Sequence, residues 1–149
     1  MKEIVKQDGF NESEKYLADL CSKTFLSLWS YPNVYTDEGK KSDNSDGKEL
    51  CDLLVVFNQH VIIFSDKDIG FKDTGNIEVN WGRWVKRAVL KSANQLYGAE
   101  NWIRERSNRI YLDPKCKHKF PLNFPSTEVI KIHRIAVAKN ATKRFFSIV

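Results

Sequence analysis

Residues 50–57 read LCDLLVVF, and residues 61–64 read VIIF. Both runs are almost wholly apolar and rich in β-branched side chains, a composition typical of strands that are buried on both faces of a sheet. The residues between them, Asn58-Gln59-His60, are polar and suit a hairpin turn. This stretch therefore predicts a β-hairpin in the middle of a sheet that is covered on both sides.

Patterns on both sides of the hairpin predict the rest of an α/β domain. Apolar residues recur at three- and four-residue steps over residues 13–29 and again over 81–106, so we expect a long helix in each range. Further strands are expected at 29–36, 109–112 and 128–137, and loops at 37–48 (a flexible surface loop), 69–80 and 113–126. The sequence thus predicts one domain over residues 1–149, with its core at about 13–138.

Composition and length exclude several classes of protein. The chain has 149 residues, of which 42% are hydrophobic and 29% charged, so it has the balance of a globular domain rather than a disordered one. No apolar run approaches the roughly 18 residues that cross a membrane. The N-terminal stretch MKEIVKQDGF lacks the apolar core of a signal peptide. We therefore expect a cytoplasmic protein with no membrane partner.

The three cysteines, Cys21, Cys51 and Cys116, are far apart and predict neither a disulfide framework nor a CxxC metal site. Cys21 and Cys51 stand in apolar runs, so we expect them to be small core residues. Cys116 and His118 could offer two zinc ligands, but no second pair stands at a suitable spacing.

An acidic residue, Asp52, interrupts the first of the two apolar runs. An ionised carboxylate inside an apolar sheet is strongly unfavourable unless a cation pairs with it. Lys67 closes the second run and would stand on the neighbouring strand of the hairpin. The residues alone leave two interpretations open. One is a buried ion pair between Asp52 and Lys67, and the other is a site where Asp52 binds Mg²⁺ and Lys67 faces a phosphate.

Glu14 follows Asn11 by three residues at the start of the first helix, a spacing that resembles a capping box. Glu14 also shares a helical line with Leu17 and Cys21, so it should face inward. Its carboxylate either caps free backbone N–H groups or belongs to a site, and the sequence leaves both open.

This order of elements, with Asp52 on one strand of the hairpin and Lys67 on the other, resembles the PD-(D/E)xK nuclease superfamily. Glu14, the tripeptide Ser65-Asp66-Lys67 and Gln95 carry the rest of the resemblance, which covers nearly the whole chain. The stretch GKELCDLLVVF followed by VIIFSDK is also similar to a group of mostly uncharacterised bacterial proteins with such a domain. The resemblance implies a restriction-endonuclease-like αβββαβ core, in which helices flank a central mixed sheet.

The same resemblance implies a divalent-metal-dependent nuclease that cleaves the phosphodiester bonds of DNA, in a defence or mobile-element system. Its cofactor would be Mg²⁺ or Mn²⁺. The implied site residues are Glu14, Asp52 and Glu49 as metal ligands, and Asp52, Lys67, Asp66 and Gln95 as catalytic residues.

Ser65 departs from the superfamily pattern, because the motif places Asp or Glu two residues before the lysine. In a regular strand Ser65 and Lys67 share one face and Asp66 points to the other. Asp66 could then act as the third acid only through a bulge or beyond the end of strand pairing. Glu49 is the other candidate, but strict alternation places it opposite Asp52. A catalytically degenerate nucleic-acid-binding or assembly module of the same fold is therefore the alternative.

Positive charge gathers on the second helical region. Seven basic and two acidic residues lie from residue 81 to residue 109, an excess equal to the net charge of +5 of the whole chain. Such a cluster suits the phosphates of a nucleic acid, and we expect DNA rather than RNA. The expected contacts are Arg83, Lys86, Arg87 and Lys91. The sequence leaves a homodimer open, and the apolar residues 145–149 either dock on the core or mark the N-terminal part of a longer effector.

Overall fold

A computed structural model describes residues 6–7, 9–25, 29–72 and 74–140. The helices are α1 (Glu12–Phe25), α2 (Ile77–Val85) and α3 (Lys91–Arg106), with a π-helical turn η1 (Lys86–Leu90) between the last two and a 3-10 turn η2 (Ser107–Arg109) after them. The strands are β1 (Ser30–Thr36), β2 (Lys48–Phe57), β3 (His60–Asp68), β4 (Ile110–Tyr111) and β5 (Lys131–Lys139).

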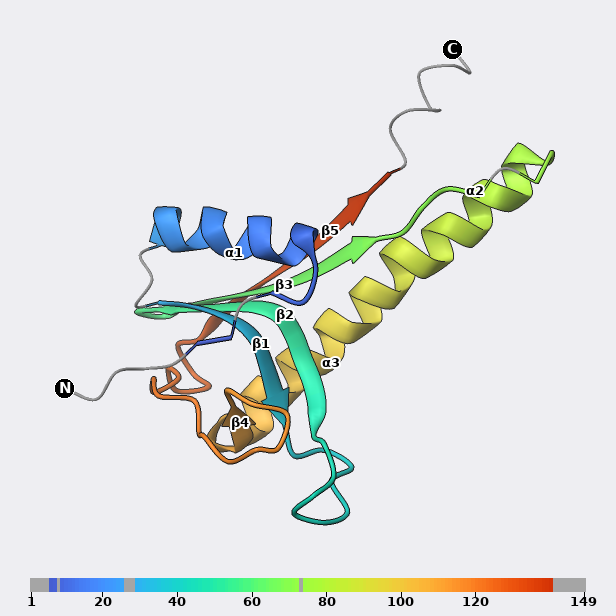
Figure 1. The fold of residues 1–149 in the computed structure, drawn as a ribbon. Coiled ribbons are helices and arrows are strands. Elements are labelled where there is room, and N and C mark those ends of the chain that lie inside the picture. Colours follow the sequence, from blue (N-terminus) through green and yellow to red (C-terminus); the bar gives the residue numbers. More distant parts are fainter. Residues whose placement is uncertain (1–5, 8, 26–28, 73, 141–149) are drawn as a thin grey trace.

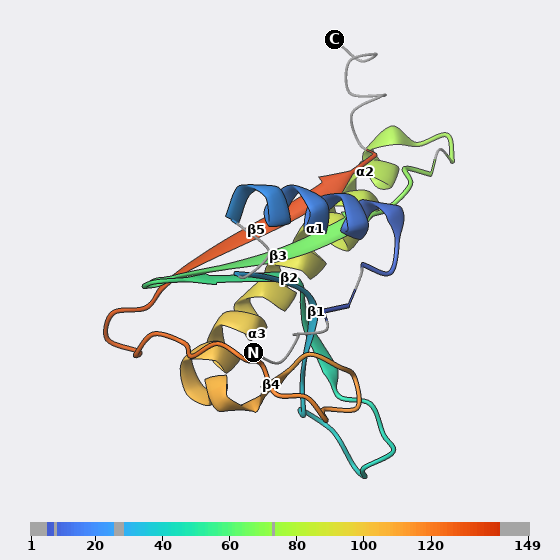
Figure 2. The same cartoon turned by 60° about the vertical axis from the view of Figure 1, so that its left-hand side comes forward.

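The five strands form one mixed sheet in the order β4-β1-β2-β3-β5. Neighbouring strands are antiparallel except β3 and β5, which are parallel and joined by the long crossover that contains α2 and α3. Helix α1 lies against one face of the sheet and α3 against the other, so the sheet is the middle one of three layers (Figure 1, Figure 2). The predicted α/β class, with a central mixed sheet flanked by helices, is confirmed.

The hairpin predicted from the two apolar runs is confirmed. β2 and β3 pair from Leu53 opposite Phe64 to Phe57 opposite His60. Asn58 takes the left-handed conformation that a tight turn requires, with a φ of 53°. β3 runs on to Asp68, so the lysine that closes the second apolar run stands on the strand itself.

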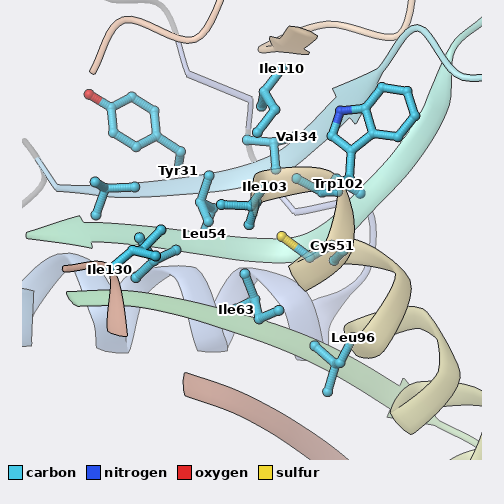
Figure 3. Packing of buried hydrophobic residues seen from close by; sticks show 14 residues of the cluster. Tyr31, Val34, Cys51, Leu54, Ile63, Leu96, Trp102, Ile103, Ile110 and Ile130 are labelled. Carbon is cyan, nitrogen blue, oxygen red and sulfur yellow. The ribbon is translucent and has the colours of Figure 1, made fainter. Parts of the chain in front are cut away.

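Side chains of the hairpin enter two separate apolar clusters. On the α3 side, Leu54 and Ile63 belong to one cluster with Ile103 of α3 (Figure 3). The cluster on the α1 side contains Leu17, Cys21, Leu53, Val55 and Phe64. Cys21 and Cys51 are buried free thiols in these clusters, as their apolar surroundings predicted.

Helix α1 begins at the expected capping box. The Glu14 backbone N–H donates to Asn11 Oδ1 at 2.9 Å, and a Glu14 carboxylate oxygen accepts the Phe10 N–H at 2.8 Å. The helix is described as far as Phe25, short of the predicted end, and residues 26–28 lie outside the described residues.

The second helical region begins earlier than predicted. Asn76 caps α2 by accepting the Val79 N–H at 3.1 Å. Ile77 and Val79 are exposed, so the first turn does not belong to the buried apolar stripe. The helical periodicity of the sequence therefore did not reveal this turn. α2, η1 and α3 form one continuous rod, whose α2 end lies near the C-terminal end of β3 (Figure 1). Within η1 the backbone bonds reach five residues back, one more than in an α-helix.

The loop between β1 and β2 contacts the segment around β4. Arg109 forms an ion pair with Asp37 at 2.9 Å, and the Gly47 N–H donates to the Pro114 carbonyl at 2.7 Å. These contacts join two segments that are far apart in the sequence, at the end of the sheet where β4 lies (Figure 1). β4 itself has only two residues, half of the predicted strand.

Among the described residues, no helix combines the length and the apolar character needed to cross a membrane. The apolar residues 145–149, for which docking on the core was one expectation, lie outside the described part of the chain.

The packing predicts a contrast between two leucines. Leu54→Ala removes a side chain with 0% exposure, so we expect the free energy of unfolding to fall by about 3 kcal/mol, from lost burial and the cavity left behind. Leu90→Ala truncates the same side chain where it is 52% exposed, and should change stability by less than about 0.5 kcal/mol. Urea denaturation measures both variants, and equal losses would contradict this packing.

Candidate functional site

The two strands of the hairpin stop pairing where Asp52 lies. At this end the last residue pair of the β2–β3 ladder joins Leu53 and Phe64. One step further, an Asp52 carboxylate oxygen accepts a hydrogen bond from the backbone N–H of Asp66. Asp52 is only 4% exposed. Its carboxylate therefore takes the place of a backbone acceptor between β2 and β3.

Lys67 provides the positive charge that a buried Asp52 requires. The Lys67 Nζ lies 3.7 Å from Asp52 Oδ2, and its side chain is 29% exposed. Burial raises the pKa of Asp52, while the Asp66 N–H and the Lys67 charge act in the opposite direction. The ion pair between Asp52 and Lys67, one of the two interpretations that the sequence left open, is present, and the lysine keeps part of its surface open to solvent.

Two further carboxylates meet at the side chain of Asn33. The Asn33 Nδ2 lies 3.1 Å from Glu49 Oε1 and 3.4 Å from Glu14 Oε2, so one amide donates to both acids. Asn33 is fully buried and has a left-handed backbone, with a φ of 47°. Glu14 thus caps α1, as one of its two interpretations expected, and it also shares the Asn33 amide with Glu49 of β2.

A bulge in β2 changes the direction of Glu49. Val34 of β1 pairs with Cys51, whereas the next residue, Tyr35, pairs with Glu49, so Leu50 is an extra residue in β2. The expectation from strict alternation, which turned Glu49 away from Asp52, fails here because the bulge breaks the alternation.

The acids and Lys67 influence one another electrostatically. Burial raises the pKa of Glu49, the negative charges of Asp52 and Glu14 raise it further, and the Asn33 hydrogen bond and the Lys67 charge lower it. Burial also raises the pKa of the neighbouring Tyr35 to about 12, with Glu49 and Glu14 adding to the effect. These groups therefore act on one another through their charges, while direct contacts join Glu14 and Glu49 to Asn33 and Asp52 to Lys67.

Ser65 and Asp66 point to opposite faces of the sheet, as their spacing predicted. The Ser65 hydroxyl lies 3.1 Å from the Ser92 hydroxyl and 3.1 Å from Gln95 Oε1, both on α3. The superfamily motif expects an acid at position 65. Here the residue is a serine, and Gln95 contacts its hydroxyl.

The Asp66 carboxylate faces α1 instead. It accepts a hydrogen bond from the Ser13 hydroxyl and lies 3.8 Å from the Lys139 Nζ of β5. Its backbone contacts Asp52, but its side chain lies with a different set of partners. The sequence did not predict Ser13 and Lys139 as partners of Asp66. The alternation of β3 indicated only that Asp66 needed partners on the face opposite Ser65.

Of the three acids, Glu49 lines a groove between β2 and α3. The groove has a volume of about 420 Å³ and is lined mostly by polar side chains, among them Glu49, Asn94, Gln95, Asn101 and Arg106. The four predicted nucleic-acid contacts, Arg83, Lys86, Arg87 and Lys91, are all exposed on the same rod of helices.

The donor set suits a divalent cation by its chemistry. Carboxylate oxygens are the ligands that Mg²⁺ prefers, and the mutual repulsion of Glu14, Glu49 and Asp52 would be relieved by a cation. As folded, however, Asn33 engages two of the acids and Lys67 the third. In the described part of the chain, no group of three or more His, Cys, Asp or Glu side chains is arranged to hold a metal ion.

The raised pKa values predict how stability depends on pH. The ordinary pKa values are 3.8 for Asp52 and 4.5 for Glu49, and both are higher in the folded protein. Above these ordinary values the folded state binds more protons than the unfolded state, so the two groups lower the free energy of unfolding as pH rises. We expect the stability of the double variant Asp52→Asn/Glu49→Gln to fall less with rising pH than that of the wild type.

Denaturation at a series of pH values from about 4 to 7 measures this difference, over the range in which carboxyl groups titrate. Asp68→Asn, which removes an exposed carboxylate from the end of β3, is the matched control. A double variant with the pH slope of the wild type would show that burial and neighbouring charges do not raise the pKa values of these acids in the folded protein.

Comparisons with known proteins identify no relative of this site. No family model matches the sequence, no curated protein matches it, and no solved structure matches the fold. The function is therefore inferred from the residues and their geometry.

Proposed function

We propose that this chain is a divalent-metal-dependent phosphodiesterase that cleaves DNA, with a restriction-endonuclease-like core of the PD-(D/E)xK type. One observation carries the proposal. Glu14 and Glu49 meet at the Asn33 amide, Asp52 pairs with Lys67 where β2 and β3 stop pairing, and the charges of the three acids act on one another. Acids in such mutual repulsion are unfavourable for stability, and a phosphate-cleaving site is a chemical reason to keep them. The element order agrees with the αβββαβ core when the rod of α2, η1 and α3 counts as one helix and the two-residue β4 is left aside.

The acids and Lys67 have separate roles in this proposal. Glu14, Glu49 and Asp52 would hold Mg²⁺ or Mn²⁺, which when bound stabilises charge on a phosphate and lowers the pKa of a bound water. Lys67, partly exposed and paired with Asp52, positions an ammonium group against the phosphate. There it offsets negative charge or orients the attacking water.

The neighbouring polar residues support the same assignment. Gln95 holds Ser65 and lines the groove beside Glu49, so it can hydrogen-bond a strand that lies in the groove. Asp66 fixes Asp52 through its backbone N–H, which is a positioning role. The exposed basic residues of α2, η1 and α3 supply charge for the rest of the DNA backbone.

The proposal predicts cleavage that depends on metal and on Lys67. Plasmid DNA should be cut in Mg²⁺ or Mn²⁺, and Lys67→Ala should lower the rate by about 10²-fold or more, because a charged group at the phosphate is lost. Lys131→Ala removes an exposed lysine from the start of β5 and is the control. Thermal denaturation should also show stabilisation by Mg²⁺ in the wild type and none in Asp52→Asn. Equal cutting in EDTA would rule the proposal out.

A non-catalytic nucleic-acid-binding module of the same fold is the second candidate. It is favoured by the placement of Ser65, whose hydroxyl is engaged by Ser92 and Gln95 where the motif needs an acid, and by Asp66, which faces α1. In this candidate no acid stands at the motif position, and binding would rest on the basic rod.

This candidate predicts DNA binding without cleavage. The logarithm of affinity should fall linearly with the logarithm of salt concentration, and removing two phosphate contacts with Lys86→Gln/Lys91→Gln should reduce that slope by about 1 to 2. Asp52→Asn should bind as the wild type does. A filter-binding series over salt concentration measures the slope, and a slope near zero in the wild type would exclude both candidates.

A further inference from the structure

A small pocket lies between α2–η1 and the loop that follows β3. Its volume is about 130 Å³, and Lys72, Arg83 and Arg87 bring three positive charges to its lining. None of the described residues that line it is acidic. The pocket is separate from the groove beside Glu49, with which it shares no lining residue.

Asn80, one of the residues that line the pocket, has a hydrogen-bond donor without an acceptor. Asn80 is 4% exposed, and the Thr74 hydroxyl donates to its Oδ1 at 2.7 Å. That bond leaves Asn80 Nδ2 as the free group, and it has no hydrogen-bond partner in the structure. A buried donor left unsatisfied is destabilising, so an acceptor bound in the pocket next to Asn80 would stabilise this part of the protein.

The three cations are likewise without ionic partners. No ion pair joins Lys72, Arg83 or Arg87 to a carboxylate of the described residues, whereas Arg104 of α3 and Arg109 of η2 are paired with acids at 2.9 Å. Three like charges around one cavity raise the local potential and attract an anion. The free donor of Asn80 and the three cations thus both favour an anion that accepts hydrogen bonds.

The pocket is held in shape by its own contacts. The Trp84 Nε1 donates to the Ile69 carbonyl at 2.8 Å, which fixes the loop after β3 to α2. A volume of 130 Å³ corresponds to a few water molecules at about 30 Å³ each, which is enough for a single tetrahedral oxyanion.

We propose that this pocket binds a phosphate group, with Asn80 Nδ2 donating to one oxygen and Lys72, Arg83 and Arg87 neutralising the charge. The phosphate is either free in solution or at the end of a DNA strand. Only the second source rests on the proposed function, because binding of inorganic phosphate needs neither DNA nor the acids at Asp52.

Calorimetric titration with inorganic phosphate at constant ionic strength tests the pocket. Asn80→Asp keeps the shape of the side chain but places a carboxylate at the free donor, and Lys72→Gln removes one exposed charge without touching the core. We expect each to weaken phosphate binding about tenfold, as for one charge-assisted contact. Lys131→Gln, the matched control for Lys72→Gln, should bind as the wild type does.

The source of the phosphate is distinguished with a short DNA oligonucleotide that has or lacks a terminal phosphate, titrated in EDTA so that nothing is cleaved. Tighter binding of the phosphorylated strand, lost in Lys72→Gln, supports the strand end as ligand. Equal binding of both strands, together with phosphate affinity that Lys72→Gln reduces, supports free phosphate. Asp52→Asn should bind phosphate normally whether or not the protein is a nuclease. Phosphate affinity that is absent in the wild type, or unchanged in Lys72→Gln, overturns the proposal.

Discussion

The burial of the Asp52 carboxylate between β2 and β3 constrains the residues around it. A carboxylate in this place needs hydrogen-bond donors and a cation, which it finds in the Asp66 backbone N–H and in Lys67. Because the side chain of Asp52 occupies the space of a ladder bond, the two strands cannot continue to pair beyond Leu53. On the neighbouring strand β1, the Asn33 amide meets the carboxylates of Glu14 from α1 and Glu49 from the bulged start of β2. Buried polar groups thus interrupt the apolar interior of the sheet on two adjacent strands.

The neutral amide of Asn33 does for Glu14 and Glu49 what the charged Lys67 does for Asp52. It donates to Glu14 and Glu49 at once, and it stands in a backbone conformation that Asn tolerates better than most residues. An amide can satisfy two acceptors, but it brings no charge, so the repulsion between the acids remains. Protonation of Glu49, movement of Lys67 toward Glu14 and Glu49, or binding of a cation would each reduce that repulsion. The energy of these acids in the folded protein therefore depends on pH and on the cations that reach them.

Local patterns predicted most of the fold, and long-range pairing decided what they missed. The apolar runs at β2 and β3 and the demand of Asp52 for a cation are properties of a few adjacent residues, so the hairpin and the Lys67 pair could be predicted. The direction of Glu49 could not, since the bulge at Leu50 arises from pairing with β1. The partners Asn33 and Lys139 come from strands whose positions depend on the whole sheet. β5 starts later than its alternating pattern suggested, because Val129 bonds back to Ser126 in a turn.

The π-helical turn η1 has a consequence for the geometry of the whole crossover. A π-turn accommodates one residue more than an α-helical turn, and each helical residue corresponds to a rotation of about 100° around the axis. The buried residues therefore follow one another in steps of four across the turn, from Trp84 through Ala88 to Ser92, and one face of the continuous rod stays buried. In a regular α-helix steps of four would carry these side chains around the axis and away from that face. The wider turn thus keeps α2 and α3 in one orientation although the chain between them has a residue more than regular winding needs.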